Sequence, residues 1–313
     1  MKMECNIDIR DAFIGKLYNY ALNNKNIVFL SAEFGAPSLD VFRRDLPLQF
    51  INVGISEQNL ISVAAGLALG GKIVYAYSIS SFLTLRCYEQ IKIDLCAMNL
   101  PVTLLGVGPG YAYSVDGPTH HATEDIAVMR ALANMTIYSP TDANMASALV
   151  GVSLKTPSPL YIRLDRGRYG TLYGMSEDLS AGFRIIKDGS DVCIFATGCM
   201  VHRAMDVERA LSEQAIKARV VDVYRLKPVD AVKLVEGVRG FSRAVTIEEH
   251  TLNGGLGSII LEVLSDQGLC IPVKRFGIAD GQLYAYGMRD TLHKQRGIDT
   301  ESIVHTLHAW LAS

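Results

Sequence analysis

The sequence lacks paired cysteines, a long hydrophobic run and an excess of charge of either sign. Its six cysteines are scattered over 313 residues without a CxxC pair, which argues against a zinc site and for reduced thiols. No apolar run reaches the roughly 18 residues that span a bilayer, and the N-terminus shows no apolar signal core. The formal charge of -2 provides no excess of positive charge that would attract nucleic acid or an anionic membrane. We therefore expect a cytoplasmic protein that binds neither.

What the chain does have is hydrophobic residues, at 49%, arranged in alternating strand-like and helix-like segments. Continuous apolar strands separated by helices predict parallel sheets that are covered on both faces. The strands expected in the first half are 27–32, 50–54, 73–77, 101–107 and the stretches MTIYSP and PLYIRLD. The alternation of strand-like and helix-like segments stops at 168–190 and resumes after it. We expect an α/β fold of two doubly wound domains with mainly parallel sheets, at 1–167 and 191–313, joined by a linker at 168–190.

Four polar features follow strands of the first domain. They are Glu57, the segment 78–82, the loop 108–121 and the LDRGR stretch that ends at Arg168. Because open parallel sheets bind ligands at the carboxyl ends of their strands, these features are expected on one edge of one sheet. The sequence therefore predicts a binding site at that edge.

Glu57 is the most unusual of these residues, because it stands between two apolar segments in INVGISEQNLISVAAG. One interpretation is an acid that interacts with the dipole at the start of a helix. The other is a buried carboxylate that exchanges a proton with a heterocycle. The DGPTHH stretch at 116–121 is similarly open: it reads as a polar turn, or as an Asp and a His held toward a substrate.

Several segments together resemble the transketolase family. They are INVGISEQNLISVAAGLALGG, SSFLTLRCYEQIKIDLCAMNLPV, VDGPTHHATEDIAVMRALANMTIYSPTD and YIRLDRGR for its pyrimidine-binding domain, and DVYRLKPVD and TIEEHTLNGGLGSIILEVL for its C-terminal domain. The resemblance covers nearly all of the chain, in the family's order. It implies an enzyme that uses thiamine diphosphate, a cofactor that carries the difficult chemistry itself.

The resemblance implies a role for each residue of the cofactor site. Glu57 corresponds to the Glu that hydrogen-bonds N1′ of the cofactor's aminopyrimidine ring and so activates the cofactor. Phe82, Leu85 and Tyr88 correspond to the pocket against that ring, where aromatic stacking adds to burial. Core packing is the alternative for these three, above all for Leu85, where the family often has an aromatic residue.

The resemblance also implies substrate contacts. Asp116 and His120 match the family's DGPTH residues, which contact the hydroxyls and carbonyl oxygen of the ketose donor, and His120 joins Glu57 as a catalytic residue. His121 has no clear counterpart and is either a further contact or a solvated loop residue.

The resemblance further implies that Arg10 and Arg166 bind a sugar phosphate, with Ser38 as a further contact. Guanidinium groups suit phosphate oxygens. Ion pairing at the surface or between domains is the alternative for both arginines. One departure stands out. Transketolases often carry a phosphate-binding His eight residues before the DGPTH Asp, and this chain has Gly108 there.

The chain shows no counterpart of the family's diphosphate-binding domain, whose GDG motif and Asn hold Mg²⁺ and the diphosphate. We expect no metal ligands here. The resemblance implies the C-terminal half of a split transketolase, inactive alone, with thiamine diphosphate and Mg²⁺ completed by an N-terminal partner subunit in a heterotetramer of two of each. The alternatives are a 1-deoxyxylulose-phosphate synthase, a β subunit of a 2-oxoacid dehydrogenase E1, and a non-catalytic regulatory or scaffolding homologue.

Overall fold

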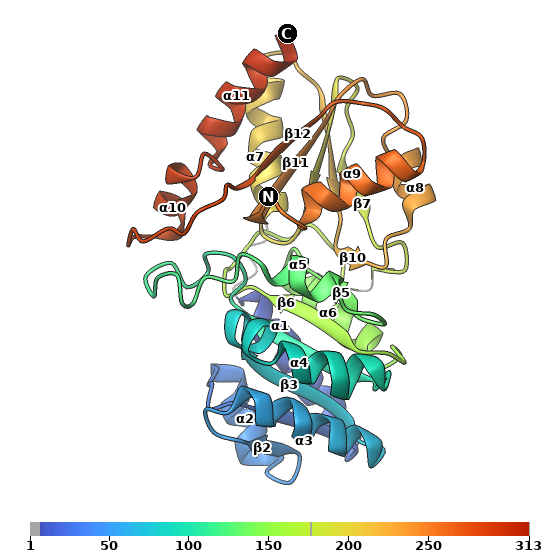
Figure 1. The fold of residues 1–313 in the computed structure, drawn as a ribbon, viewed down its shortest axis with the longest axis vertical. Helices are drawn as coiled ribbons and strands as arrows, with labels where there is room; N and C mark the ends of the chain where they lie inside the picture. Colours follow the sequence, from blue (N-terminus) through green and yellow to red (C-terminus); the bar gives the residue numbers. More distant parts are fainter. Residues whose placement is uncertain (1–6, 176, 313) are drawn as a thin grey trace.

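Two sheets, each flanked by helices, make up the computed structural model, which describes residues 7–175 and 177–312 (Figure 1). The first sheet has the order β10-β5-β6-β4-β3-β1-β2 and the second the order β12-β11-β8-β9-β7. Within the first sheet, β1 to β6 pair in parallel, and within the second, β8, β9, β11 and β12 do. The α/β class with two mainly parallel sheets is confirmed.

The strands of the first sheet come from the first half of the chain, with one exception. They are β1 (Ile27–Ser31), β2 (Phe50–Asn52), β3 (Ile73–Ile79), β4 (Val102–Val107), β5 (Thr136–Tyr138), β6 (Leu160–Leu164) and β10 (Arg225–Lys227). The central strands β1, β4 and β6 are buried at every position, as expected for continuous apolar strands between two helical layers.

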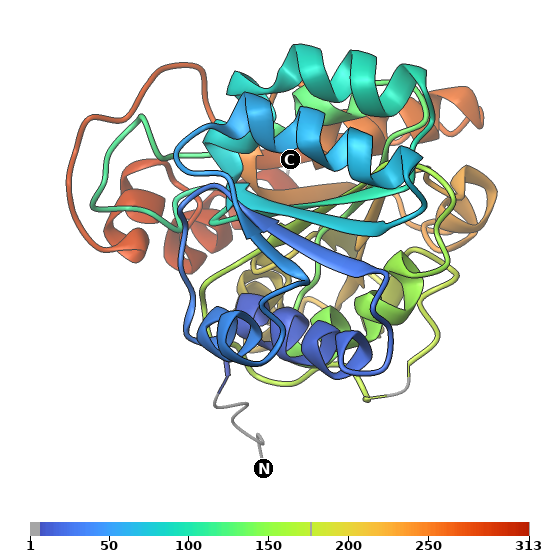
Figure 2. The ribbon, with the colours of Figure 1, turned by 90° about the horizontal axis from the view of Figure 1, so that it is seen from below.

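Helices cover both faces of this sheet, as Figure 2 shows from below. One layer contains α1 (Ile9–Ala21), α2 (Pro37–Asp45) and α6 (Ala143–Ser153); the other contains α3 (Glu57–Leu69), η1 (Phe82–Arg86), α4 (Tyr88–Gln90), η2 (Ile91–Ala97) and α5 (Asp125–Arg130). The helix expected over 82–97 is present, but two of its parts, η1 and η2, have π-helical hydrogen bonding. Such π segments are rare and occur often at functional sites.

The second sheet is smaller. Its strands are β7 (Arg184–Lys187), β8 (Val192–Ala196), β9 (Ala218–Asp222), β11 (Ala244–Thr251) and β12 (Val273–Ile278). The helices α7 (Met200–Ser212), α10 (Arg289–Gln295) and α11 (Thr300–Ala312) pack on one face, and α8 (Ala231–Glu236) and α9 (Leu256–Asp266) on the other. Within 168–190, the stretch suggested as a linker, β7 forms an antiparallel edge strand of this sheet.

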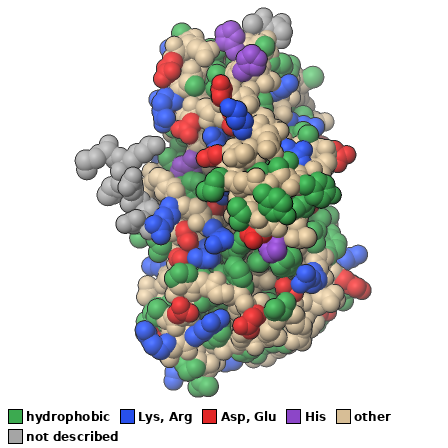
Figure 3. Space-filling model, turned by 90° about the vertical axis from the view of Figure 1, so that its left-hand side faces the viewer, with side chains coloured by type: hydrophobic (Ala, Val, Ile, Leu, Met, Phe, Trp, Pro, Cys, Tyr) green, Lys and Arg blue, Asp and Glu red, His purple; other side chains and the backbone are tan. Residues whose placement is uncertain are grey.

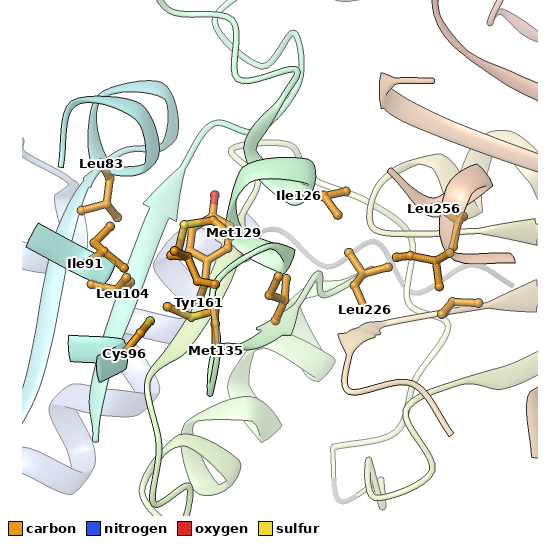
Figure 4. Packing of buried hydrophobic residues seen from close by; sticks show 14 of the residues in the cluster. Leu83, Ile91, Cys96, Leu104, Ile126, Met129, Met135, Tyr161, Leu226 and Leu256 are labelled. Atoms are coloured by element: carbon orange, nitrogen blue, oxygen red, sulfur yellow. The ribbon is translucent and has the colours of Figure 1, made fainter. Parts of the chain in front are cut away.

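The two halves share a strand and a hydrophobic core. Strand β10 belongs to the second half by sequence but pairs antiparallel with β5 at the edge of the first sheet. One continuous cluster of buried side chains runs from Leu104 and Ile126 through Leu226 to Leu256 (Figure 4). The second half is therefore packed directly against the helical layer that begins with Glu57.

No helix of the described residues is long and apolar enough to cross a bilayer. The cysteines of the described part of the chain are all free, and Cys87, Cys96 and Cys193 are buried. Burial raises the pKa of the Cys96 thiol to about 11, so this thiol is protonated at neutral pH. Cys5 lies outside the described residues.

Candidate active site

The edge of the first sheet gathers the four features that the sequence singled out. Helix α3 begins with Glu57 a few residues after β2, η1 follows β3, the loop 108–121 follows β4, and the segment 165–168 follows β6. These strands belong to one sheet and run in parallel, so their carboxyl ends meet, as the topology of an open parallel sheet requires.

Glu57 is buried, with 3% of its surface exposed, at the first position of α3. Its one hydrogen-bond partner among the described residues is Arg86, whose Nη1 donates to Oε2 at 2.7 Å. The Arg86 side chain remains 47% exposed. The acid is thus at a helix start, where the dipole favours a negative charge, and it also faces a cation from η1. Sequence spacing gave no sign of that cation, because 29 residues separate the two.

The Phe82 ring lies between Arg86 and the DGPTH loop. The Arg86 guanidinium lies over the ring, with Cζ 4.6 Å from its centroid. On the other side, the ring of His120 meets it edge-on, with centroids 5.0 Å apart. Glu57, Arg86, Phe82 and His120 therefore form one chain of contacts across the sheet edge, and three of these four residues were predicted from the sequence.

Leu85 and Tyr88 lie differently from Phe82. Leu85 is 50% exposed, while Tyr88 is half-buried and packs against the core cluster that contains the α3 side chains. Phe82 packs against the cluster on the opposite face of the sheet. The π-helical turn explains the difference, because its wider spacing does not keep residues i, i+3 and i+6 on one face. Their role in a cofactor pocket stays a prediction.

The two histidines of the DGPTHH loop point to different places. His120 is half-buried beside Phe82, and its Nδ1 lies 2.9 Å from the hydroxyl of Thr119. His121 is buried against Tyr111, with ring centroids 4.8 Å apart, and burial lowers the pKa of its imidazole. Asp116 is exposed at the tip of the loop. The structure thus makes His120 available to a ligand and packs His121 away.

Tyr113 explains the glycine at position 108. Gly108 has a φ of +75°, and a Cβ there would lie 2.0 Å from the Tyr113 ring. The ring of Tyr113 therefore fills the space that a side chain at 108, such as the family's His, would need. It also lies 6.0 Å from the His120 ring and under the guanidinium of Arg166, 4.7 Å away. Sequence reasoning did not single out Tyr113.

Arg166 and Arg10 differ in exposure and in whether a carboxylate of the chain compensates their charge. Arg166 is exposed and lies against the Tyr113 ring, with no carboxylate of the described residues in ion-pair contact. Arg10 is 6% exposed and forms ion pairs with Asp8 at 3.3 Å and Asp11 at 3.0 Å. Ser38 donates a hydrogen bond to Asp11 at 2.6 Å. The charge of Arg10 is therefore compensated within the chain, and that of Arg166 is not.

Arg163, another arginine of the YIRLDRGR stretch and the alternative to Arg166 for the phosphate contact, is engaged elsewhere. It is buried, and it donates to Asp125 at 2.7 and 3.0 Å. A cation held in this way has no donor group directed at solvent, so the arginine of this pair that remains open to a ligand is Arg166.

A buried ionic network behind the site links it to the second half. Arg289, at the start of α10, donates to Asp165 at 2.8 Å and to Glu249, while His293 bonds the same Glu249. Asp165 in turn accepts from the backbone of Gly167 at 2.7 Å, which shapes the turn that carries Arg166. Sequence reasoning missed Arg289, because 124 residues separate it from Asp165.

No group of three or more His, Cys, Asp or Glu side chains in the described part of the chain is arranged to hold a metal ion. What the sheet edge does offer is a buried carboxylate beside an aromatic ring, a histidine and one uncompensated arginine. That set suits a flat, nitrogen-containing ring together with an anionic, hydroxylated substrate.

Comparisons with known proteins identify the family. The transketolase pyrimidine-binding domain matches residues 6–171, and the transketolase C-terminal domain matches residues 182–303. The chain belongs to the transketolase family.

Individual relatives are similar along most of their length. An apulose-4-phosphate transketolase subunit from Actinobacillus succinogenes is 35% identical, over 84% of this chain and 85% of that protein. The corresponding subunit from Phocaeicola vulgatus is also 35% identical, over 96% of each chain. A solved structure described as "Split gene transketolase, inactive beta4 tetramer" superimposes with a TM-score of 0.88 at 34% identity, covering 98% of this chain and 99% of that one. The chain is thus a transketolase-type subunit.

Proposed function

We propose that this chain is the C-terminal subunit of a two-subunit, thiamine-diphosphate-dependent transketolase, which moves a two-carbon ketol unit from a ketose donor to an aldose acceptor. The observation that carries the proposal is the buried Glu57 at the sheet edge, in one line of contacts with Phe82 and His120. A purely structural acid needs no such neighbours. We place the enzyme in the cytoplasm, where scattered thiols stay reduced.

The residues present fit the cofactor's aminopyrimidine ring. The contacts of the Arg86 guanidinium support this fit, because a planar group there hydrogen-bonds Glu57 and lies against the Phe82 ring. In the proposed complex Glu57 holds the aminopyrimidine through a hydrogen bond, and Phe82 packs against it, with Leu85 and Tyr88 closing the pocket. Bound there, thiamine diphosphate supplies the nucleophilic carbon that cleaves and remakes the ketose carbon–carbon bond.

The loop residues meet the substrate. His120 lies beside Phe82 and therefore next to the cofactor ring, where its imidazole exchanges a proton with the donor's oxygen atoms. Asp116 stands exposed on the same loop and accepts hydrogen bonds from sugar hydroxyls.

An anionic group on the substrate fits the far side of Tyr113. Arg166 is exposed and its charge is uncompensated there. Arg10 and Ser38 both donate hydrogen bonds to Asp11, and we propose them as further contacts of the same ligand. Related chains are named for apulose-4-phosphate and, in a Clostridium species at 33% identity, for 6-deoxy-6-sulfo-D-fructose. One substrate name carries a phosphate and the other a sulfonate, so we propose a ketose with an anionic end.

A partner subunit completes the site. The matched domains do not include one for the diphosphate, and the described residues hold no metal-binding group. We propose an N-terminal partner that binds Mg²⁺ and the diphosphate, in a heterotetramer. The tetramer of the similar split-gene protein is described as inactive, which supports an inactive chain without its partner.

We propose a surface for that partner next to the site. Hydrophobic side chains gather at mid-height on the face shown in Figure 3. Among the described residues, the loops 108–121 and 279–288 expose Val115, Tyr284, Tyr286 and Met288. The two loops lie side by side, since Gly117 lies near the Tyr286 ring. Apolar exposure of this kind beside a site marks an interface.

Calorimetric titration tests the proposal. Thiamine diphosphate with Mg²⁺ is titrated into the chain alone and into the chain co-purified with a partner that bears the GDG motif. We expect binding in the mixture only, followed by ketol transfer from anionic ketoses. Tight binding to the chain alone would mean that it holds a diphosphate site of its own. Absence of binding in both samples would leave a scaffolding role.

A further inference from the structure

Arg86 occupies a position that the proposed function assigns to the cofactor. Its Nη1 donates to the buried Oε2 of Glu57 at 2.7 Å, and its Cζ lies 4.6 Å from the centroid of Phe82. These are the two side chains that would hold the aminopyrimidine ring. Glu57 has no other hydrogen-bond partner among the described residues, so Arg86 is the group that compensates its charge when the chain is on its own.

The guanidinium and the aminopyrimidine make the same demands on a site. Each is a flat, delocalised N–C–N unit that presents a face to an aromatic ring: the guanidinium donates an in-plane hydrogen bond to the Glu57 carboxylate, and the aminopyrimidine shares a proton with it at N1′. A cation over an aromatic face gains further attraction. A ring that lies against the same face of Phe82 takes the space of the guanidinium, whose Cζ is 4.6 Å from the ring centroid, so the guanidinium must leave when such a ring arrives.

We propose that Arg86 is a built-in stand-in for the cofactor's aminopyrimidine ring: it holds the ring's place in the unassembled chain and withdraws into solvent when the cofactor binds. The inference rests on the proposed function of Glu57 and Phe82. The Arg86 side chain is already 47% exposed, and its long stem allows the guanidinium to turn outward without a change in the backbone.

A physical reason for the contact between Arg86 and Glu57 is the cost of burying an unpaired carboxylate. A carboxylate with 4% side-chain exposure and no partner is costly, and removing one member of a buried ion pair is strongly destabilising. Arg86 compensates Glu57 until partner and cofactor arrive. The same contact competes with the cofactor, so the measured affinity is lower than the site alone would give. Arg86 therefore stabilises the unassembled chain but lowers the affinity of the assembled complex for the cofactor.

The test is thiamine diphosphate binding to the assembled complex by calorimetry, with Mg²⁺ present, for the wild type and Arg86→Met. Methionine keeps the apolar stem and removes the competing donor. We expect Arg86→Met to bind the cofactor about tenfold more tightly, the size of one hydrogen bond to a charged group. Arg209→Met is the matched control: this arginine of α7 is 59% exposed and also paired with a carboxylate, that of Asp206. Its affinity should equal that of the wild type.

The outcomes separate the two proposals. Wild-type binding with equal or weaker binding by Arg86→Met overturns the stand-in and makes Arg86 an orienting partner that stays with Glu57. No binding by any complex overturns the proposed function, and the stand-in with it. If Arg86→Met does not assemble, Arg86→Lys carries the test, because lysine keeps the charge but not the flat donor fork. It should then bind the cofactor more tightly than the wild type, and equal or weaker binding contradicts the stand-in.

Discussion

At the scale of single residues, the site depends on which charges are compensated. Glu57 and Arg10 were both predicted to bind ligands, and both are buried and paired within the chain, with Arg86 and with two aspartates respectively. Arg166 has an aromatic face beside it instead of a carboxylate. Spacing along the chain shows which residues can reach a site, but it does not show which of them still has a free charge there.

Replacing Glu57 by Gln should abolish ketol transfer in the assembled enzyme, by at least about 100-fold, because a positioned proton-exchanging group contributes that much or more. The amide keeps the volume of the side chain and can still accept a hydrogen bond from Arg86, so folding should be intact. Turnover measured beside a thermal melt checks both statements. Activity within a few-fold of the wild type would remove the proposed mechanism.

Replacing Arg166 by Met should weaken substrates with an anionic end far more than uncharged ones. A charge-assisted hydrogen bond to an anion is typically worth about 1.5–3 kcal/mol, or roughly 10- to 100-fold in kcat/KM. The comparison is kcat/KM for a phosphorylated ketose and for its unphosphorylated form. Arg168→Met, exposed two residues further along, is the control that should change neither. An equal loss for both substrates would show that the assignment is wrong.

At the scale of elements, β11 and α5 are joined by a histidine that must stay neutral. The Nδ1 of His250 donates to the Thr251 carbonyl at 2.7 Å, and its Nε2 accepts from the Ala127 backbone at 3.3 Å. Burial lowers the pKa of His250 to about 4. Asp125 and Glu248 lie 4.0 and 3.9 Å from the ring. The strand end and the helix start therefore share one proton-sensitive contact.

The sign of the pH effect follows from that lowered pKa. The unfolded chain binds a proton at His250 near pH 6.5 and the folded chain only near 4, so the contribution of His250 to stability is lost as the pH falls between these values. From pH 7 to 5 the loss is about 2 kcal/mol. The buried Glu248, whose pKa is raised to about 7, acts in the opposite direction.

His250→Gln isolates this effect, because the same Glu248 is present in both proteins. Urea unfolding at pH 7 and pH 5 should show a smaller acid loss in the variant, by about 2 kcal/mol. Parallel curves for the two proteins would mean that His250 is not held neutral in the folded chain.

At the scale of the whole molecule, the two α/β halves are joined by three kinds of contact, so we expect them to unfold as one cooperative body. Strand β10 pairs with β5 of the other half, the core cluster crosses the boundary, and Arg289 bonds the Asp165 turn. The hydrogen bond of Glu57 and the ring contacts of Phe82 are made with Arg86 and His120, which belong to the first half. It holds the turn that presents Arg166, and its loop 279–288 lies against the DGPTH loop.

Leu226→Ala tests this coupling. The side chain is 1% exposed within the shared cluster, and the deletion should cost about 2–5 kcal/mol through lost burial and the remaining cavity. Because the cluster belongs to both halves, calorimetry should show one transition that moves to lower temperature as a unit. Two separated transitions, with only one of them shifted, would contradict a single cooperative body.

The sequence by itself determined the alternation of strands and helices, the parallel sheets and the position of Glu57 at a strand-to-helix junction. These follow from local apolar periodicity and from the chain order of the elements. Phe82 follows β3, and Asp116 and His120 lie in the loop after β4; their proposed roles come from the resemblance of these segments to transketolases and stay predictions.

Only the tertiary structure decided which partners these residues meet. Arg86 reaches Glu57 from another helix, Tyr113 fills the space beside Gly108, and β10 leaves its own half to extend the first sheet. Contacts of this kind depend on how the chain packs in three dimensions, and a pattern of neighbouring residues carries no information about side chains that approach from distant elements.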